Sequence, residues 1–291
     1  MIAYVKGGCS LTVIQCDGYI RVSGCGPFSG YNTFENGQCF RFLPHPEGGY
    51  AGVAWGRAIR LWSDGEDLCL QASAQEFESI WKHYLDLERD YESIGRALST
   101  DPILAQAVHY CRGLHMLAQD PWETLCAFIL SQCCNIPRIR KMLDILCRQL
   151  GQPVMLGKET FYAFPSAQTL AACTPEDLSP VRAGYRTRYL LSAAKKVADG
   201  FDFAALKRLS TDDARTQLMQ FDGVGRKVAD CVLLFGLQKL DAFPVDTWMK
   251  KAQALWPQGF PDGLFGETAG IAQQYIFHAI RSQKIGISHK K

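Results

Sequence analysis

The sequence lacks any hydrophobic run long enough to cross a membrane, and it contains no repeats and no low-complexity linkers. A membrane-spanning helix needs about 20 consecutive apolar residues, so an integral membrane protein is not expected. The first ten residues carry one lysine and no long apolar stretch, which is unlike a secretory signal. These absences predict a soluble, intracellular protein without a membrane partner.

The sequence has twelve cysteines but none of the spacings that typically hold a metal. There is no Cys-x-x-Cys pair, and no cysteine follows Cys231, so neither a zinc finger nor an iron–sulfur cluster is expected. The cysteines are scattered through apolar segments, which favours reduced, buried thiols over disulfides. A Walker-type loop and a Rossmann fingerprint are also missing, so a nucleotide-binding enzyme is the least favoured class.

The charge is unevenly distributed along the chain, although its net value is only +2. Residues 181–291 contain 17 Lys and Arg against 10 Asp and Glu, a net charge of +7. Residues 1–180 contain 14 against 19, a net charge of −5. A basic C-terminal part is compatible with a polyanionic partner such as DNA.

The N-terminal part has the pattern of an antiparallel sheet with one buried face. Two apolar stretches, residues 11–16 and 19–22, flank Asp17-Gly18, a dipeptide typical of two-residue hairpins. Asn36-Gly37 is a second dipeptide of this kind. Further strand-like stretches follow between residues 53 and 70.

The hydrophobic period changes to that of helices at Ser73, which forms a capping-box pattern with Glu76. From there to the end the pattern is almost only helical. We therefore predict an α+β protein of two domains. Residues 1–98 form an antiparallel β-rich N-terminal domain that ends in one or two helices. Residues 99–291 form a helical domain that contains a helix-hairpin-helix at 211–238.

The most informative segment is residues 218–231, which predict a helix, a tight turn and a second helix. Gly223 and Gly225 permit the turn and a close backbone approach. The second helix, which includes Val228, begins directly after them, so its free N–H groups can bind an anion such as a DNA phosphate. A plain turn between helices is the alternative for Gly-x-Gly alone, but the full pattern is much more specific.

Two charged residues in this region are candidates for catalysis. Lys227 lies in the first turn of the second helix, where the helix dipole opposes its charge and favours a free, nucleophilic amine. Cys231 lies four residues later, on the same helix face. Nineteen residues after Lys227, Pro244-Val-Asp246 introduces another helix. The alternatives are a surface lysine and a simple N-cap, although a cap also holds a carboxylate in a defined position.

The segment 218–249 resembles the helix-hairpin-helix glycosylase motif with its Gly/Pro-rich loop and aspartate, and most closely that of the 8-oxoguanine DNA glycosylases. Three other segments resemble the same family in the same order. Residues 36–41, Asn-Gly-Gln-Cys-Phe-Arg, are similar to its GQxFR strand. Residues 131–138, Ser-Gln-Cys-Cys-Asn-Ile-Pro-Arg, are similar to its SxNNNIxRI segment. Residues 183–189, Ala-Gly-Tyr-Arg-Thr-Arg-Tyr, are similar to its LGYRARY segment.

The resemblance implies an enzyme that flips a damaged nucleotide out of the duplex and excises an oxidised purine. It assigns Lys227 as the nucleophile that forms a Schiff base with the sugar, and Asp246 as the acid that stabilises developing positive charge. The lesion would be recognised by the carbonyl of Gly37, which accepts the N7–H found in the oxidised base. The remaining base-pocket residues that the resemblance implies are Cys231 and Phe277 on the two base faces, Gln273 on the Watson–Crick edge, and Pro244.

The DNA-binding residues that the resemblance implies come from the hairpin and from three other segments. They are Gly223, Gly225, Val228, Gln132, Cys133, Asn135, Arg138, Tyr185, Arg186 and Trp248. Two departures from the family are visible. Cys133 and Cys134 stand where the family often has asparagines, and Trp248 stands where it often has a phosphate-binding histidine. Cysteine is a poor hydrogen-bond partner, which predicts looser recognition of the opposite base unless Gln132 contributes.

We therefore expect a monomer that binds double-stranded DNA containing an oxidised purine. It would work beside DNA, in the cytoplasm or nucleoid of a bacterium or in a nucleus. No metal, iron–sulfur cluster or other cofactor is expected, and a monovalent cation at the hairpin is compatible with the motif. The alternatives are a non-catalytic hairpin protein that only binds DNA, and a glycosylase of the same fold for another damaged base. The first has no use for Lys227 paired with Asp246.

Overall fold

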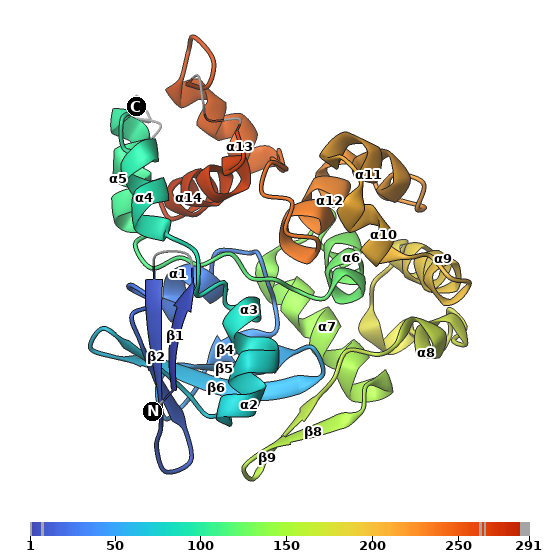
Figure 1. Ribbon diagram of the computed structural model, residues 1–291. Helices are drawn as coiled ribbons and strands as arrows, with labels where there is room; N and C mark the ends of the chain where they lie inside the picture. The colour runs from blue at the N-terminus through green and yellow to red at the C-terminus, as the bar shows by residue number, and fades with distance from the viewer. Residues whose placement is uncertain (1, 7–8, 262–263, 265, 286–291) are drawn as a thin grey trace.

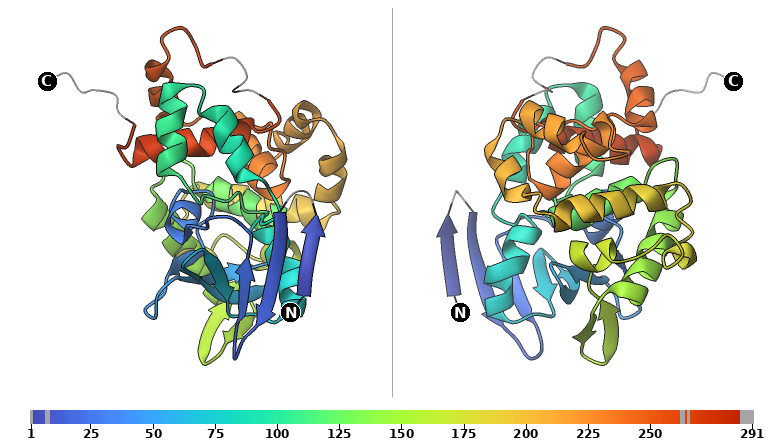
Figure 2. Two further views of the ribbon diagram at one scale, coloured as in Figure 1. Left: turned by 60° about the vertical axis from the view of Figure 1, so that its left-hand side comes forward. Right: turned by 90° about the vertical axis from the view of Figure 1, so that its right-hand side faces the viewer.

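The computed structural model describes residues 2–6, 9–261, 264 and 266–285. Its N-terminal part contains a seven-stranded antiparallel sheet in the order β1-β2-β3-β7-β6-β5-β4 (Figure 1). The β1–β2 hairpin stands at one edge of the molecule (Figure 2). The strands are β1 (Ile2–Lys6), β2 (Cys9–Gln15), β3 (Ile20–Ser23), β4 (Phe42–Pro44), β5 (Tyr50–Ala54), β6 (Arg57–Asp64) and β7 (Asp67–Leu70).

One of the two predicted hairpin turns is present and the other is not. Gln15 pairs with Ile20, so Asp17-Gly18 lies in the turn between β2 and β3, as predicted. Asn36-Gly37 joins no strands, and the strand predicted over residues 36–41 is wrong. These residues form a loop between helix α1 (Gly30–Phe34) and β4. Gly37 has a φ of +87°, which glycine adopts without strain, and it uses this freedom in the loop because no strands flank it to form a hairpin.

A short helical segment follows the sheet and packs against it. It begins at the predicted capping box, in which Ser73 Oγ accepts from Glu76 N and the Glu76 carboxylate accepts from Ser73 N. The segment consists of α2 (Ala74–Glu76), the π-helical turn η1 (Phe77–Trp81) and α3 (Lys82–Tyr84). The buried Phe77 and Trp81 join the core of the sheet, which explains why this face of the sheet is apolar.

The rest of the chain is mainly helical, which confirms the predicted α+β class. Elements distant in sequence pack together: α5 lies against α14 (Figure 1). No helix among the described residues is long and apolar enough to cross a membrane. The helices are α4 (Tyr91–Leu98), α5 (Pro102–Tyr110), α6 (Pro121–Leu130), α7 (Ile136–Leu150), α8 (Ala167–Ala171), η2 (Ser179–Val181), α9 (Arg186–Ala198), α10 (Phe203–Arg208), α11 (Thr211–Leu218), α12 (Arg226–Cys231), η3 (Val232–Gly236), α13 (Thr247–Ala252), η4 (Gln253–Leu255) and α14 (Ala269–Arg281).

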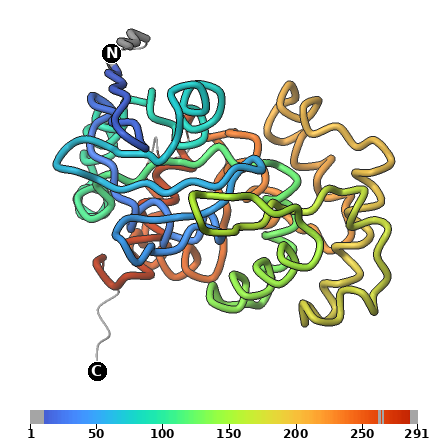
Figure 3. Tube along the Cα trace, turned by 90° about the horizontal axis from the view of Figure 1, so that it is seen from below, coloured from blue at the N-terminus to red at the C-terminus, as the bar shows by residue number. Residues whose placement is uncertain are grey.

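The nearly all-helical prediction after residue 73 misses one β-hairpin. Strands β8 (Pro153–Leu156) and β9 (Glu159–Tyr162) form a separate two-stranded sheet. The hairpin lies alongside β5 and β6, where the yellow-green and light-blue segments run together in Figure 3. Its strands are short and largely exposed or half-buried, so they carry little of the apolar alternation by which strands are predicted.

The described residues form two hydrophobic cores. One lies between the sheet and the η1 segment, and the other lies among the helices from α5 to α14. Phe40, from the loop before β4, belongs to the helical core, whereas Leu117, from the segment before α6, belongs to the core of the sheet. Each part therefore contributes a residue to the core of the other. Because Phe40 lies three residues after Gly37, the loop that carries Gly37 lies beside the helical domain.

Candidate active site

The predicted helix-hairpin-helix consists of α11, the turn 219–225 and α12. Gly223 has a φ of +74°, and an added Cβ would lie 2.4 Å from the Tyr189 ring, so both the turn and the packing require glycine. Gly225 precedes α12 at the N-cap position and is exposed. Val228 points into the core. The exposed backbone N–H groups at the start of α12 are therefore available to an anion.

Lys227 lies on the first turn of α12 and is half-buried. Its Nζ lies 5.0 Å from the centroid of the Phe128 ring, which comes from α6. Phe128 is 3% exposed and is held in the helical core. The face of the ring attracts the lysine ammonium group by a cation–π interaction. Lys227 lies in the wall of a cavity and not on an open surface.

Asp246 is the N-cap of α13, as the sequence predicts. Its Oδ1 accepts hydrogen bonds from the backbone N–H groups of Trp248 and Met249, each at 2.9 Å. The second carboxylate oxygen makes no hydrogen bond within the described part of the chain. The cap fixes the orientation of the carboxylate, and Asp246 lines the same cavity as Lys227.

The cavity has a volume of about 740 Å³ and brings together residues from three of the four segments that resemble the family, 36–41, 131–138 and 218–249, with Phe277 and Arg281 of α14. The charged residues in its wall are Lys227, Lys250, Arg281 and Asp246, so basic groups outnumber acidic ones. This balance suits an anionic substrate. The predicted site residues that line the cavity are Gly37, Gln132, Cys133, Asn135, Lys227, Asp246, Trp248 and Phe277.

Gly37 and Phe277 are in contact on one wall of the cavity. A Cβ added to Gly37 would lie 3.5 Å from Cε1 of Phe277. Helix α14, which carries Phe277, is tied to α1 by a hydrogen bond from His278 Nε2 to Asn32 Oδ1 at 3.1 Å. Burial and the nearby Arg281 lower the pKa of His278 to about 4, so this histidine is neutral at pH 7. The position of α14 in this wall is therefore fixed by a buried hydrogen bond between two uncharged side chains, His278 and Asn32.

Three predicted base-pocket residues lie outside the cavity wall. Cys231, Gln273 and Pro244 are buried, and the Oε1 of Gln273 accepts a hydrogen bond from Gln274. Burial raises the pKa of the Cys231 thiol to about 11, although the nearby Lys227 ammonium opposes this shift and Asp246 adds to it. The thiol therefore remains protonated at neutral pH.

The segment with two cysteines forms the turn between α6 and α7 and lies at the mouth of the cavity. Asn135 caps α7 by accepting from Arg138 N at 3.0 Å. Cys133 has a φ of +48° and is exposed. Arg186 fixes this turn by donating hydrogen bonds to the backbone carbonyls of Gln132 and Cys133.

The two residues from the 183–189 segment differ sharply in exposure. Arg186 is only 5% exposed, so its guanidinium is committed to the turn and is not a solvated charge. Tyr185 is 49% exposed, and its ring lies 4.6 Å from the Arg186 guanidinium carbon. Arg138 is exposed, and Trp248, half-buried in the cavity wall, has the Lys251 ammonium 4.6 Å from its ring.

The cavity wall also contains residues that the sequence did not predict for the site, among them Phe128, Lys250 and Arg281. Phe128 belongs to a run of buried, mostly apolar residues in α6, so the sequence does not distinguish it from core. Lys250 lies four residues after Asp246, a spacing that places both on one helix face and could have indicated it. Arg281 lies four residues after Phe277 in the same way, with its guanidinium carbon 5.6 Å from that ring.

Comparisons with known proteins identify relatives over most of the chain. The family model for the N-terminal domain of 8-oxoguanine DNA glycosylase matches residues 26–125. A probable N-glycosylase/DNA lyase from Methanothermobacter thermautotrophicus is 31% identical over 232 residues, which cover 69% of this chain and 74% of the relative.

Two solved structures resemble nearly the whole chain. The first, MBOgg1 in complex with a low-affinity DNA ligand, has a TM-score of 0.89 and 36% identity, and the match covers 94% of this chain and 99% of that one. The second, 8-oxoguanine glycosylase/lyase of Clostridium acetobutylicum with double-stranded DNA containing cytosine opposite 8-oxoG, has a TM-score of 0.88, 33% identity and the same coverage. The chain belongs to the 8-oxoguanine DNA glycosylase/lyase family of helix-hairpin-helix proteins.

Proposed function

We propose that this protein excises 8-oxoguanine from duplex DNA and then cleaves the strand at the resulting abasic site. The observation that carries the proposal is the meeting of Lys227 and Asp246 in one cavity of about 740 Å³, with Gly37 and Phe277 in its wall. A protein that only bound DNA would need the hairpin but neither of these two charged groups. The proposed partner is double-stranded DNA, bound by a monomer wherever the cell keeps its DNA.

The proposed reaction begins with Lys227 as a free amine. Its Nζ attacks C1′ of the flipped nucleotide, the bond from C1′ to the base breaks, and the base leaves with the bonding electrons and takes up a proton. The amine nitrogen then loses a proton, the bond from C1′ to the ring oxygen breaks, and the ring oxygen leaves with the bonding electrons and takes up a proton, which yields a protonated Schiff base on Lys227. Removal of a C2′ proton then breaks the C3′–O bond, and the phosphate leaves with that electron pair.

Asp246 supports this sequence electrostatically. As the bond to the base lengthens, positive charge develops on the sugar, and a carboxylate held in place by its helix cap stabilises that charge without reorganisation. The same group can carry protons between the amine and the sugar. All of these steps use the chain's own side chains, so we propose no cofactor for the chemistry. A monovalent cation at the hairpin would serve DNA binding alone.

Base recognition is proposed to depend on the carbonyl of Gly37. The oxidised base has an N7–H donor where guanine has an acceptor, so a single carbonyl attracts one base and repels the other. Phe277 would stack on one face of the base. Cys231 and Gln273, both buried behind the cavity wall, would complete the pocket. Arg138 and Tyr185, both exposed, would contact the strand opposite.

Gly37→Ala is expected to slow 8-oxoguanine excision by about tenfold or more. Alanine is strained at a φ of +87°, so the backbone shifts and the carbonyl moves, although the added Cβ would meet the Phe277 ring only at an ordinary van der Waals distance of 3.5 Å. Single-turnover excision rates measure the effect. Gly18→Ala is the matched control, because Gly18 has a φ of +76° with open space around it. Equal losses of excision in both variants would mean that the loss comes from general backbone strain, and this would contradict a specific role of the Gly37 carbonyl.

The experiment that tests the function is borohydride trapping on duplexes with 8-oxoguanine opposite C, T, G or A. Hydride reduces the Schiff base to a stable amine, so a covalent protein–DNA adduct reports the proposed intermediate. We expect an adduct with at least one partner base, and its yield across the four duplexes measures the opposite-base preference, which Cys133 and Cys134 are predicted to loosen. Binding without any adduct would contradict the lyase step.

A further inference from the structure

The loop that carries Gly37 is held from inside the protein by the next residue, Gln38. Residues 35–41 contain no helix or strand, so no ladder of backbone hydrogen bonds fixes the position of the Gly37 carbonyl. Gln38, by contrast, is completely buried and lies outside the cavity wall. A buried amide must satisfy its donors and acceptors within the protein, and Gln38 does so in a way that connects distant elements.

The Gln38 side chain makes three hydrogen bonds. Its Nε2 donates to the carbonyls of Thr33 and His115, each at 2.8 Å, and its Oε1 accepts from Leu117 N at 2.9 Å. Both amide hydrogens are therefore used. The backbone of Gln38 is held as well, since its carbonyl accepts from Gln119 Nε2 at 2.7 Å.

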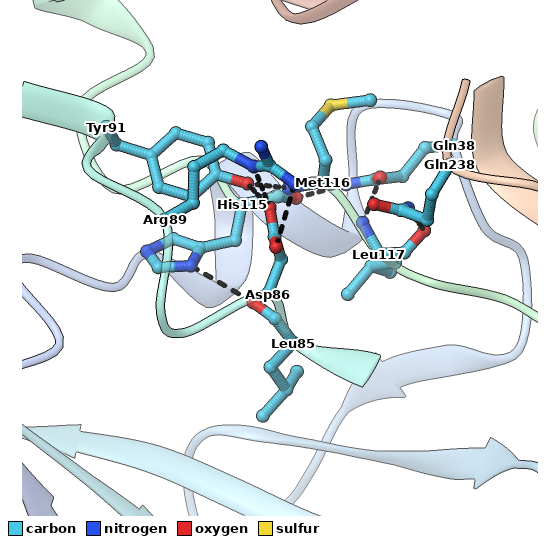
Figure 4. A network of polar contacts seen from close by, with 9 residues as sticks. All are labelled: Gln38, Leu85, Asp86, Arg89, Tyr91, His115, Met116, Leu117 and Gln238. Atoms are coloured by element: carbon cyan, nitrogen blue, oxygen red, sulfur yellow. Dashed lines mark hydrogen bonds and ion pairs between the residues drawn. The ribbon is translucent and has the colours of Figure 1, made fainter. Parts of the chain in front are cut away.

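The partner segment, residues 115–119, is itself attached to the helix that continues α12. Gln119 N donates to the carbonyl of Phe235 in η3 at 2.9 Å. Gln238 Nε2, just beyond η3, donates to the carbonyl of Leu117 at 3.0 Å. Figure 4 shows Leu117 between Gln38 and Gln238. Since α12 and η3 are continuous in the chain, hydrogen bonds connect the Gly37 loop to the helix of Lys227.

Aromatic packing provides a second connection between the same two points. Phe40, from the Gly37 loop, meets the Phe128 ring edge-on with centroids 5.6 Å apart. Phe128 stacks on Phe235 of η3 at 5.4 Å and also lies under the Lys227 ammonium. The Gly37 loop and Lys227 are therefore connected in two ways, by the aromatic contacts of Phe40, Phe128 and Phe235 and by the hydrogen bonds of Gln38.

We propose that Gln38 is a positioning residue for lesion recognition: it sets where the Gly37 carbonyl lies relative to Lys227. The inference rests on the function proposed above. A hydrogen bond weakens steeply when its geometry is lost, so a displaced carbonyl loses its preference for the N7–H of the oxidised base. Cleavage at an abasic site needs Lys227 but involves no base to recognise. Loss of positioning should therefore slow excision alone, whereas general damage to the fold should slow both reactions.

The test compares two rates in Gln38→Met and Gln238→Asn. One is single-turnover excision of 8-oxoguanine, and the other is cleavage of a duplex with a preformed abasic site. Gln38→Met keeps the volume and removes the hydrogen bonds. We expect excision to fall by about tenfold or more, with abasic-site cleavage within about twofold of wild type. Gln238→Asn removes only the contact with Leu117 O and should show a smaller loss in the same direction, which keeps the test open if Gln38→Met folds poorly.

Leu68→Ala is the control for stability, because Leu68 is buried in the N-terminal sheet and belongs neither to the cavity nor to the Gln38 contacts. It should leave the ratio of the two rates unchanged. A proportional loss of both rates in the Gln38 and Gln238 variants, or no loss, would overturn the proposed role. Failure of the wild-type protein to excise 8-oxoguanine would instead overturn the proposed function and the inference with it.

Discussion

Lys227→Gln is expected to abolish base excision, strand cleavage and borohydride trapping, while affinity for a duplex with 8-oxoguanine stays within about threefold. Glutamine keeps much of the length and polarity of the side chain, but its amide nitrogen has no basic lone pair and cannot form a Schiff base. Phosphate contacts supply most of the affinity of such proteins, and the backbone N–H groups at Gly225 are untouched. Trapping yields and equilibrium binding at one fixed salt concentration measure the two effects.

Lys250→Gln is a matched control, since it removes the same charge from the wall of the same cavity. This variant should bind DNA more weakly yet still form the covalent adduct. Two results would count against Lys227 as the nucleophile. An adduct with Lys227→Gln would place the reacting amine elsewhere, and loss of binding to the damaged duplex would mean that the lysine mainly holds DNA.

Asp246→Asn is expected to slow excision by about a hundredfold or more, with little change in melting temperature. The amide oxygen of asparagine can accept the same hydrogen bonds from Trp248 N and Met249 N, so the cap of α13 survives. What is lost is the negative charge opposite the developing positive charge on the sugar. Single-turnover rates and thermal unfolding of the same preparations separate these two roles.

Asp246→Ala provides the comparison, because it removes the charge and the cap together. We expect the same loss of rate, together with a destabilisation of about 1 kcal/mol from the lost cap. If Asp246→Asn lowered the melting temperature strongly and the rate only slightly, Asp246 would be a structural cap without a catalytic role.

Local patterns predicted those elements whose signal lies within a few residues. The Asp17-Gly18 turn and the capping box of Ser73 with Glu76 are both present, because each depends on contacts between near neighbours. Asn36-Gly37 carries the same kind of signal as Asp17-Gly18, but it lies in a loop. There, contacts with residues about 80 positions away decide the conformation. The β8–β9 hairpin was missed because its strands are short and not buried on one face.

The second helix of the predicted hairpin shows a related limit. Residues 226–231 are α-helical, but residues 232–236 form a π-helical turn in which one extra residue is accommodated. Hydrophobic periodicity does not distinguish these two forms over five residues. The turn ends beside Leu117 and Gln119, so its geometry is connected to contacts that a local pattern does not contain.

The sequence by itself determined the family motif, the hairpin glycines and the two residues proposed for catalysis. Those signals are local: Gly223 and Lys227 share one turn, and Asp246 caps the next helix. Only the tertiary structure decided which residues meet in the cavity and which stay behind its wall. It buried Arg186 against the turn of Gln132, and it joined Gln38 to the helix of Lys227. Such contacts join residues far apart in the chain, so no local pattern in the sequence contains them.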